Sequence, residues 1–208
     1  MKRRLVSLSG AIVLGLGVGV VHADIDAASR AAAERVAVGT CATCHGPRGH
    51  SVSPKFPVLA GQHSTYLLAQ LQAFKAQTRG DPDALGYMQG MAAPLDDELM
   101  ASLADYYSRQ TPVAGPSAPA AMVARGKEIY QSGDAAEGVP PCAACHGTDA
   151  AGTNDYPRLA GQHVQYLMKQ LRSFQNNMRN VAVMHGVARG LQVNDMQAIA
   201  SYLQTLGP

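Results

Sequence analysis

The chain contains the stretch Cys41-Ala42-Thr43-Cys44-His45-Gly46 and repeats it, with one change, as Cys142-Ala143-Ala144-Cys145-His146-Gly147. A second block follows each stretch and is also matched: Pro57-Val58-Leu59-Ala60-Gly61-Gln62-His63 and Pro157-Arg158-Leu159-Ala160-Gly161-Gln162-His163. Matched residues continue to the end of each half, where they include the pairs Met88/Met184, Met100/Met196 and Tyr106/Tyr202. Self-similarity over this length indicates two halves that share one fold.

The pattern Cys-x-x-Cys-His is the attachment sequence of a c-type haem. Two thiols on one helical turn can each add to a haem vinyl group, and the adjoining histidine then points at the iron. The alternatives are a thioredoxin-like redox pair, a disulfide framework and a zinc site. A redox pair would follow a strand, and a zinc site would leave two histidines spare. All four cysteines belong to the two copies, so the sequence predicts two covalently bound haem c groups, held by Cys41, Cys44, Cys142 and Cys145.

His45 and His146 are then the proximal axial ligands of the two irons. A metal-bound imidazole normally donates its second N–H to an acceptor that fixes its orientation. The carbonyl groups of Pro57 and Pro157 are candidates, because each follows its histidine at similar spacing and keeps a free C=O. The alternative is that these prolines only shape a turn.

The opposite axial ligand is predicted from the repeat, because equivalent pockets should use equivalent residues. Met88 matches Met184, whereas Met91 matches Val187 and His185 matches Gln89. We therefore expect Met88 and Met184, in loops before the last helix of each half, to bind iron. Two other matched pairs are expected to serve elsewhere: Met100/Met196 in core packing, and His63/His163 at capping or surface positions rather than as a bis-histidine pair.

The first residues read as a secretory signal peptide, because Met1-Lys2-Arg3-Arg4 precedes an apolar run that ends at Val21-His22-Ala23. A membrane anchor is the alternative, but the run is short and contains serines and glycines. We predict a signal peptide at 1–23, an N-terminal domain at 24–110, a linker at 111–120 and a C-terminal domain at 121–208. The linker is rich in proline and uncharged.

Charge argues against binding to nucleic acid. The formal net charge is +2, and loss of the three basic residues of the leader leaves −1. Such a chain has no basic run with which to neutralise phosphates. With no Trp and only three Phe, each half is also poor in large rings, and a buried haem would supply the missing apolar bulk.

Helical periodicity is legible in three segments of the first half: Ala27 to Val38, Tyr66 to Gln77 and Leu95 to Arg109. Asp96 is a suitable N-cap for the third of these helices, while its repeat mate Gln192 is a weak one. The turn-forming residues Gly80-Asp81-Pro82-Asp83 have no match in the second half and read as a surface loop. The sequence therefore predicts two small all-helical domains.

The chain resembles the dihaem cytochrome c4 family over nearly its whole length after the leader. The resemblance rests on both Cys-x-x-Cys-His sites, both Pro-x-Leu-Ala-Gly-Gln segments and the pair Arg79/Arg179. The resemblance implies an all-α fold of two tandem class I cytochrome c-type domains, each around one covalent haem with His and Met at the iron. It also implies that Arg79 and Arg179 lie near the haem propionates, although a solvated helix end is an alternative.

The resemblance further implies an electron-transfer protein of the periplasm and not an enzyme. Such a carrier would be soluble or held peripherally at the inner-membrane surface, with a respiratory complex as donor and a terminal oxidase as acceptor. The main alternative is the dihaem cytochrome subunit of a flavocytochrome c sulfide dehydrogenase, which has a permanent flavoprotein partner. A catalytic dihaem protein would need a labile ligand at one iron, whereas the repeat offers the same ligands in both halves.

Overall fold

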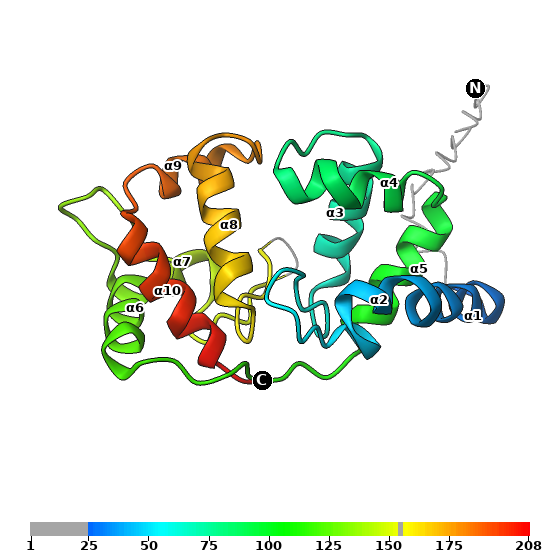
Figure 1. The fold of residues 1–208 in the computed structure, drawn as a ribbon, viewed down its shortest axis with the longest axis horizontal. Coiled ribbons are helices and arrows are strands. Elements are labelled where there is room, and N and C mark those ends of the chain that lie inside the picture. Colours follow the sequence, from blue (N-terminus) through cyan, green and yellow to red (C-terminus); the bar gives the residue numbers. More distant parts are fainter. Residues whose placement is uncertain (1–24, 154–155) are drawn as a thin grey trace, which may run out of the picture.

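The computed structural model of the protein describes residues 25–153 and 156–208. The predicted signal peptide, residues 1–23, lies outside these ranges. Within them the chain forms two helical halves that lie side by side, with α3 and α8 toward the middle (Figure 1). The described residues form no strand, and the one β-bridge among them is an isolated antiparallel bridge between Asp134 and Val139. The all-helical prediction is confirmed.

The two halves share one order of long helices. The first half contains α1 Ala27–Val36, α2 Ala42–His45, α3 Ser64–Lys75, α4 Gln89–Ala92 and α5 Asp97–Ser108, together with the π-helical turns η1 Ala37–Cys41 and η3 Ala84–Met88 and the 3-10 turn η2 Pro47–Gly49. The second half contains α6 Ala120–Ser132, α7 Ala143–His146, α8 Val164–Gln175, α9 Ala182–Ala188 and α10 Val193–Thr205. No helix in the described ranges has the length and apolar character needed to cross a bilayer.

The first and last helices of each half pack together and form most of its core. In the second half α6 lies against α10, and in the first half α1 lies against α5. The side chain of Asp96 accepts a hydrogen bond from the Leu99 N–H (2.8 Å) and so begins α5 as predicted, whereas Gln192 caps α10 without such a bond. Met100 and Met196 are buried in these packed helices, which confirms their expected core role.

The segments that lead into the two Cys-x-x-Cys-His motifs differ. In the first half α1 continues through η1 directly into α2. In the second half α6 stops at Gly133, whose positive φ of 74° suits glycine, and a loop closed by the Asp134–Val139 bridge precedes α7. The motif is nevertheless helical in both halves, as its chemistry requires.

Helices α3 and α8 end in the same way, just before residues that contact the opposite half. Each helix is followed by a residue in the left-handed region, Gln77 with φ +56° and Asn177 with φ +55°. A left-handed residue ends a helix and turns the chain away from its axis. Two residues further on, the guanidinium groups of Arg79 and Arg179 lie 4.5 and 4.7 Å from the ring centroids of Phe74 and Phe174, which belong to these helices.

Residues 111–119 form no helix or strand and run along one edge of both halves (Figure 1). This course fits the expected linker, and the domain boundaries at 110/111 and 120/121 remain predictions. The chain end lies close to the linker (Figure 1), where the Gly115 N–H donates to the Gln204 carbonyl (2.8 Å).

Candidate haem sites and the interface between them

The two attachment motifs lie in equivalent helical turns. Cys44 and His45 belong to α2, and Cys145 and His146 belong to α7. None of the four cysteines forms a disulfide; Cys44 and Cys145 are exposed, and the first cysteine of each motif is partly buried. Burial raises the pKa of Cys142 to about 11. Each motif therefore presents an outer thiol, an inner thiol and a histidine on a single turn.

Both histidines are oriented by the predicted proline carbonyls. His45 Nδ1 lies 2.9 Å from the carbonyl oxygen of Pro57, and His146 Nδ1 lies 3.0 Å from that of Pro157. Burial lowers the pKa of both imidazoles, which favours the neutral form that binds metal. Because Nδ1 carries the proton donated to the carbonyl, Nε2 is left with a free lone pair for iron.

Aromatic rings support the same two histidines from equivalent positions. The ring of Phe56 lies edge-on to His45 with centroids 6.3 Å apart, and Tyr156 lies in the same way against His146 at 6.0 Å. A ring held by one hydrogen bond and one edge contact has little freedom to rotate. These residues fit a haem that is bound through two thioether bonds and one imidazole.

The candidate distal ligands lie in short helical segments and not in loops, so that part of the prediction is wrong. Met88 ends η3 and packs with Phe74, Ala84 and Ala92. This cluster is separate from the one that includes Cys41. Met184 lies in α9, and both methionines are half-buried. Iron binding by Met88 and Met184 remains a prediction.

Arg79 and Arg179 are buried, with 6% and 5% of their surface exposed, so neither is a solvated helix end. Arg79 forms a bidentate pair with Asp81, through Nε (2.8 Å) and a terminal nitrogen (2.9 Å). Burial acts to raise the pKa of Asp81, but the hydrogen bonds and charge of Arg79 outweigh it and the pKa lies below its usual value. Gly80 and Pro82 are exposed, as expected of a surface loop, but Asp81 between them is 1% exposed.

The two arginines also join the halves to each other. Arg79 donates to Gln70 of its own half and to Gln170 of the other half (2.9 and 3.0 Å). Arg179 donates to Gln170 of its own half (2.7 Å) and to Gln70 and the Tyr66 hydroxyl of the other (2.8 and 2.7 Å). The interface therefore contains a polar network in which Arg79 has a carboxylate partner, while the side chains that accept from Arg179 are neutral.

Sequence reasoning missed the function of the Leu-Ala-Gly-Gln-His segments, which bind the opposite half in a reciprocal way. The Gln162 amide accepts from the Val58 N–H and donates to the Val58 carbonyl (both 2.9 Å). The Gln62 amide does the same to Arg158, at 2.8 and 2.9 Å. The duplicated Gln-His pair was the available signal, but its partners are residues distant in the sequence.

His63 and His163 occupy the N-cap positions of α3 and α8, within the expected capping or surface positions, but their side chains are interface groups. Each precedes a helix, but its side chain makes no capping bond. His63 Nε2 instead lies 2.9 Å from the Ala151 carbonyl oxygen, and His163 Nε2 lies 2.9 Å from that of Ser51. His163 is 8% exposed. Their rings are thus engaged across the interface, which leaves the bis-histidine alternative unsupported.

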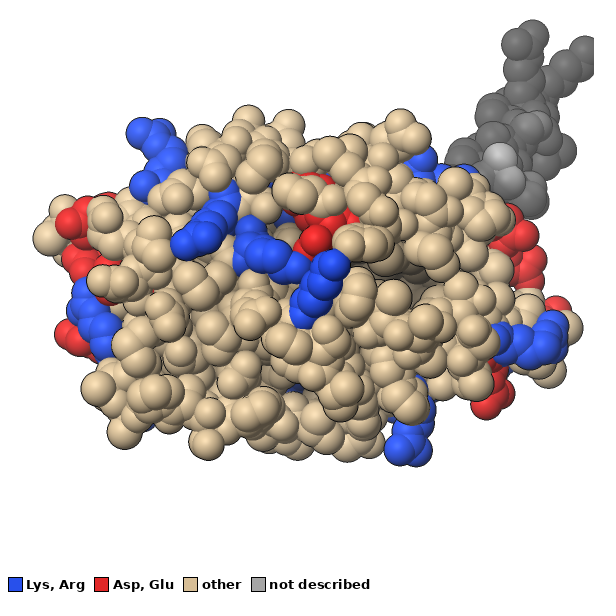
Figure 2. Space-filling model, in the orientation of Figure 1, with Lys and Arg blue, Asp and Glu red and all other residues tan. Residues whose placement is uncertain are grey.

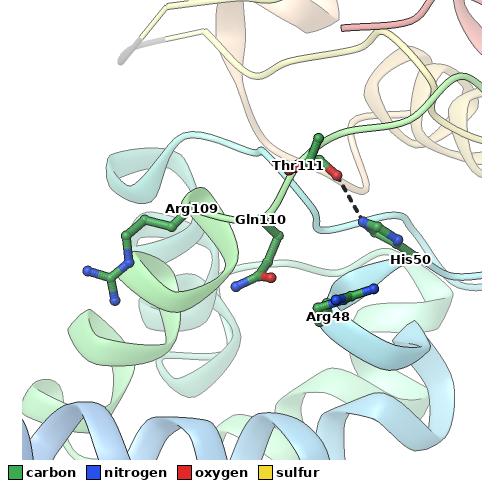
Figure 3. Close-up of a pocket in the computed structure, with 5 residues that line it drawn as sticks. All are labelled: Arg48, His50, Arg109, Gln110 and Thr111. Atoms are coloured by element: carbon green, nitrogen blue, oxygen red, sulfur yellow. Dashed lines mark hydrogen bonds between the residues drawn. The ribbon is translucent and has the colours of Figure 1, made fainter.

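A polar cavity of about 190 Å³ lies where the first half meets the linker, lined by Arg48, His50, Arg109, Gln110 and Thr111 (Figure 3). His50 Nε2 lies 2.9 Å from the Thr111 carbonyl oxygen, while Arg109 extends away from His50 (Figure 3). This bond fixes the loop after the first haem motif to the beginning of the linker. The residues that line the cavity include no cysteine or methionine.

Comparison with known proteins agrees with this arrangement. The family model described as Cytochrome c matches residues 31–108 and 123–207. The chain is 39% identical to cytochrome c4 of Azotobacter vinelandii, over 99% of this chain and 100% of the relative. Among solved structures, reduced recombinant cytochrome c4 from Pseudomonas stutzeri is 37% identical with a TM-score of 0.76, and the match covers 86% of this chain and 98% of that one.

A thiosulfate dehydrogenase (TsdBA) from Marichromatium purpuratum is also similar, with a TM-score of 0.75 and 30% identity. That match covers 86% of this chain but only 40% of the dehydrogenase chain. The same two-part helical architecture therefore occurs both as a separate protein and as a portion of a longer one.

Proposed function

From the premise that the chain belongs to the cytochrome c4 family and is a dihaem electron carrier, we propose that it works in the periplasm. There it passes single electrons from a respiratory complex toward a terminal oxidase. The observation that carries the proposal is the equivalence of the two sites. Each has two cysteines on one turn and a buried histidine held by a proline carbonyl. Equivalent sites favour a relay of electrons over a division into a catalytic and an accessory centre.

The residues around each site are suited to an iron that changes its charge, because they can stay in place when an electron is gained or lost. When bound, each haem supplies one iron that gains or loses a single electron. His45 and His146 are fixed before any change of charge, because the carbonyl and the aromatic edge hold each ring. If Met88 and Met184 bind the irons as predicted, each iron would be held by two protein ligands and would have no position open to a substrate, which argues against catalysis.

The surface supports brief encounters with partner proteins. Figure 2 shows a face made mostly of uncharged residues, with Lys and Arg side chains gathered near its centre beside an acidic patch. Among the charged residues, Lys169 pairs with Asp83 of the other half and donates to the Lys55 carbonyl (3.0 Å). A mostly neutral face with few charges fits a transient redox interface better than it fits binding to nucleic acid.

A second candidate donor is a thiosulfate-oxidising enzyme. The likeness to part of a thiosulfate dehydrogenase chain favours it, and reduction of the purified protein by such an enzyme would distinguish it from a respiratory complex. The flavocytochrome alternative is not favoured, because the matched cytochrome c4 is aligned over its full length. Peripheral attachment to the inner membrane belongs to the same proposal and is tested by fractionation of cells in low and high salt.

We expect the mature protein to begin near Asp24 and to carry two haems through thioether bonds. All four cysteines lie in the two motifs, so each haem takes two thiols and none is left over. Intact mass after acid and denaturant measures this, because thioether-linked haem survives both treatments. A mass without two haem increments would contradict the proposed function.

We expect the C-terminal haem to have the higher reduction potential. Residues 24–110 carry nine acids and seven bases, and residues 111–208 carry six and seven. Positive charge favours the reduced iron. At about 15 Å in a water-like dielectric, each charge contributes roughly 0.3 kcal/mol, so the difference of three charges gives about 35 mV. Asp81, which pairs with Arg79 and has no counterpart in the second half, is one of the acids that make up this difference.

Redox titration at low ionic strength tests this order, with the haems assigned by altering Met184 alone. Added salt should reduce the separation, because it screens the surface charges. If the N-terminal haem is the more oxidising of the two, charge does not set the order and the proposed direction of internal transfer is wrong.

A further inference from the structure

Each half contributes a glutamine to a hydrogen-bond chain that ends on the proximal histidine of the other half. The carbonyl that accepts from His45 Nδ1 belongs to the peptide group between Pro57 and Val58. The N–H of that same peptide group donates to Gln162 Oε1 of the opposite half (2.9 Å). One peptide group is therefore hydrogen-bonded at both ends, to the histidine on one side and to the other half on the other.

The second half has the same arrangement. The carbonyl that accepts from His146 belongs to the peptide group between Pro157 and Arg158, and its N–H donates to Gln62 Oε1 (2.8 Å). Both glutamines are 7% exposed. The two hydrogen-bond chains are reciprocal and have the same number of links, and each ends at a candidate iron ligand. Non-specific packing between the halves would not explain this.

The orientation of each glutamine amide is fixed by its neighbours. Gln162 Oε1 accepts from two backbone N–H groups, those of Val58 (2.9 Å) and His163 (3.1 Å), while Nε2 donates to the Val58 carbonyl (2.9 Å). Rotating the amide by 180° would place an NH₂ group against two donors. The acceptor oxygen is therefore held against the peptide N–H that leads to His45.

We infer that Gln62 and Gln162 are positioning residues that tune the iron of the opposite half. A peptide group that donates through its N–H becomes a stronger acceptor at its C=O, since hydrogen bonds in a chain polarise one another. A stronger acceptor withdraws the Nδ1 proton and makes the imidazole a better electron donor to iron. This stabilises the oxidised form, so each glutamine lowers the reduction potential of the haem across the interface.

The inference rests on the proposed haem ligation by His45 and His146, and the experiment uses the full-length holoprotein. Replacing Gln162 with leucine removes the polarising acceptor. We expect the reduced-to-oxidised ratio of the N-terminal haem to rise about threefold at a fixed electrode potential, or roughly 28 mV for one electron. The C-terminal haem should change less. Gln62→Leu should produce the mirror result, with the larger shift at the C-terminal haem.

His163→Leu is the matched control. His163 is the next residue, is equally buried and also bonds across the interface, but to the Ser51 carbonyl and not to the Pro57–Val58 peptide group. Its loss weakens the same interface without breaking the chain to His45. If Gln162→Leu gives poor yield, Gln162→Met keeps the side-chain length while removing the amide and should give the same shift.

Each haem is followed separately by NMR, using hyperfine-shifted haem methyl signals in the oxidised protein and the His45 Nδ1–H signal in the reduced protein. The proton signal should move upfield in Gln162→Leu, as its hydrogen bond weakens, and stay in place in His163→Leu. A shift confined to the half that carries the substitution, or one equal to that of His163→Leu, would overturn the inference. Absence of a haem spectrum in the unaltered protein would instead contradict the proposed function.

Discussion

In Met88→Ala, the oxidised protein is expected to lose half of its methionine-to-iron charge-transfer absorption, and the potential of the N-terminal haem is expected to fall by on the order of 0.1 V. Thioether sulfur stabilises reduced iron, and the choice of axial ligand is the largest single influence on a haem potential. The loss should be half because Met184 continues to serve the other site. Absorption spectra of the oxidised protein together with a redox titration measure both effects.

Met91→Ala is the control for this experiment, because Met91 lies three residues further on, is 44% exposed and has no methionine partner in the repeat. It should leave both the absorption and the potential unchanged. In the second half the neighbour of Met184 is His185, whose Nδ1 lies 2.8 Å from the Phe174 carbonyl oxygen. If Met91→Ala removes half of the band while Met88→Ala leaves it intact, the assignment of the distal ligand is wrong.

Features that depend on short stretches of sequence were predictable. The spacing of Cys41, Cys44 and His45 specifies a helical turn, and the Pro57 carbonyl lies close enough along the chain to reach the histidine without help from another domain. Asp96 begins α5 because a carboxylate at that position satisfies a free N–H of the first turn. In each case the partner is within about a dozen residues, so the local chain determines the contact.

Features that depend on the opposing half were not predictable. Gln162 shows no sequence signal for Val58, which is 104 residues away. Asp81 pairs with Arg79 of its own half, but the opposing half completes their burial, because Gln170 accepts from Arg79 (3.0 Å) and donates to Asp81 (3.5 Å). The distal methionines were placed in loops because no apolar period identifies a five-residue π-helical turn such as η3. The repeat showed which residues are matched between the halves, but not that they lie at an interface or what they contact.

The packing of α6 on α10 leads to the other large effect, which concerns stability. A Cβ atom added to Gly126 would lie 2.0 Å from the carbonyl oxygen of Ala198, well inside van der Waals contact with backbone. Glycine within a helix costs about 1 kcal/mol relative to alanine, so Gly126→Ala would stabilise an isolated α6. In the folded protein the helices must instead separate, which exposes Ile129 and Tyr130, both fully buried.

We therefore expect Gly126→Ala to lower the free energy of unfolding by about 1–3 kcal/mol, and Gly126→Val to lower it further. Lys127→Ala, at the exposed next position, should change it by no more than about 0.5 kcal/mol. Urea unfolding of the holoprotein followed by far-UV circular dichroism measures all three. In the first half, Ala33 of α1 is fully buried in the cluster that includes Leu103 and Ala104 of α5, so a Cβ atom is accommodated there. An unfolding midpoint of Gly126→Ala equal to or above that of the unaltered protein would show that α6 can move away from Ala198 at little cost.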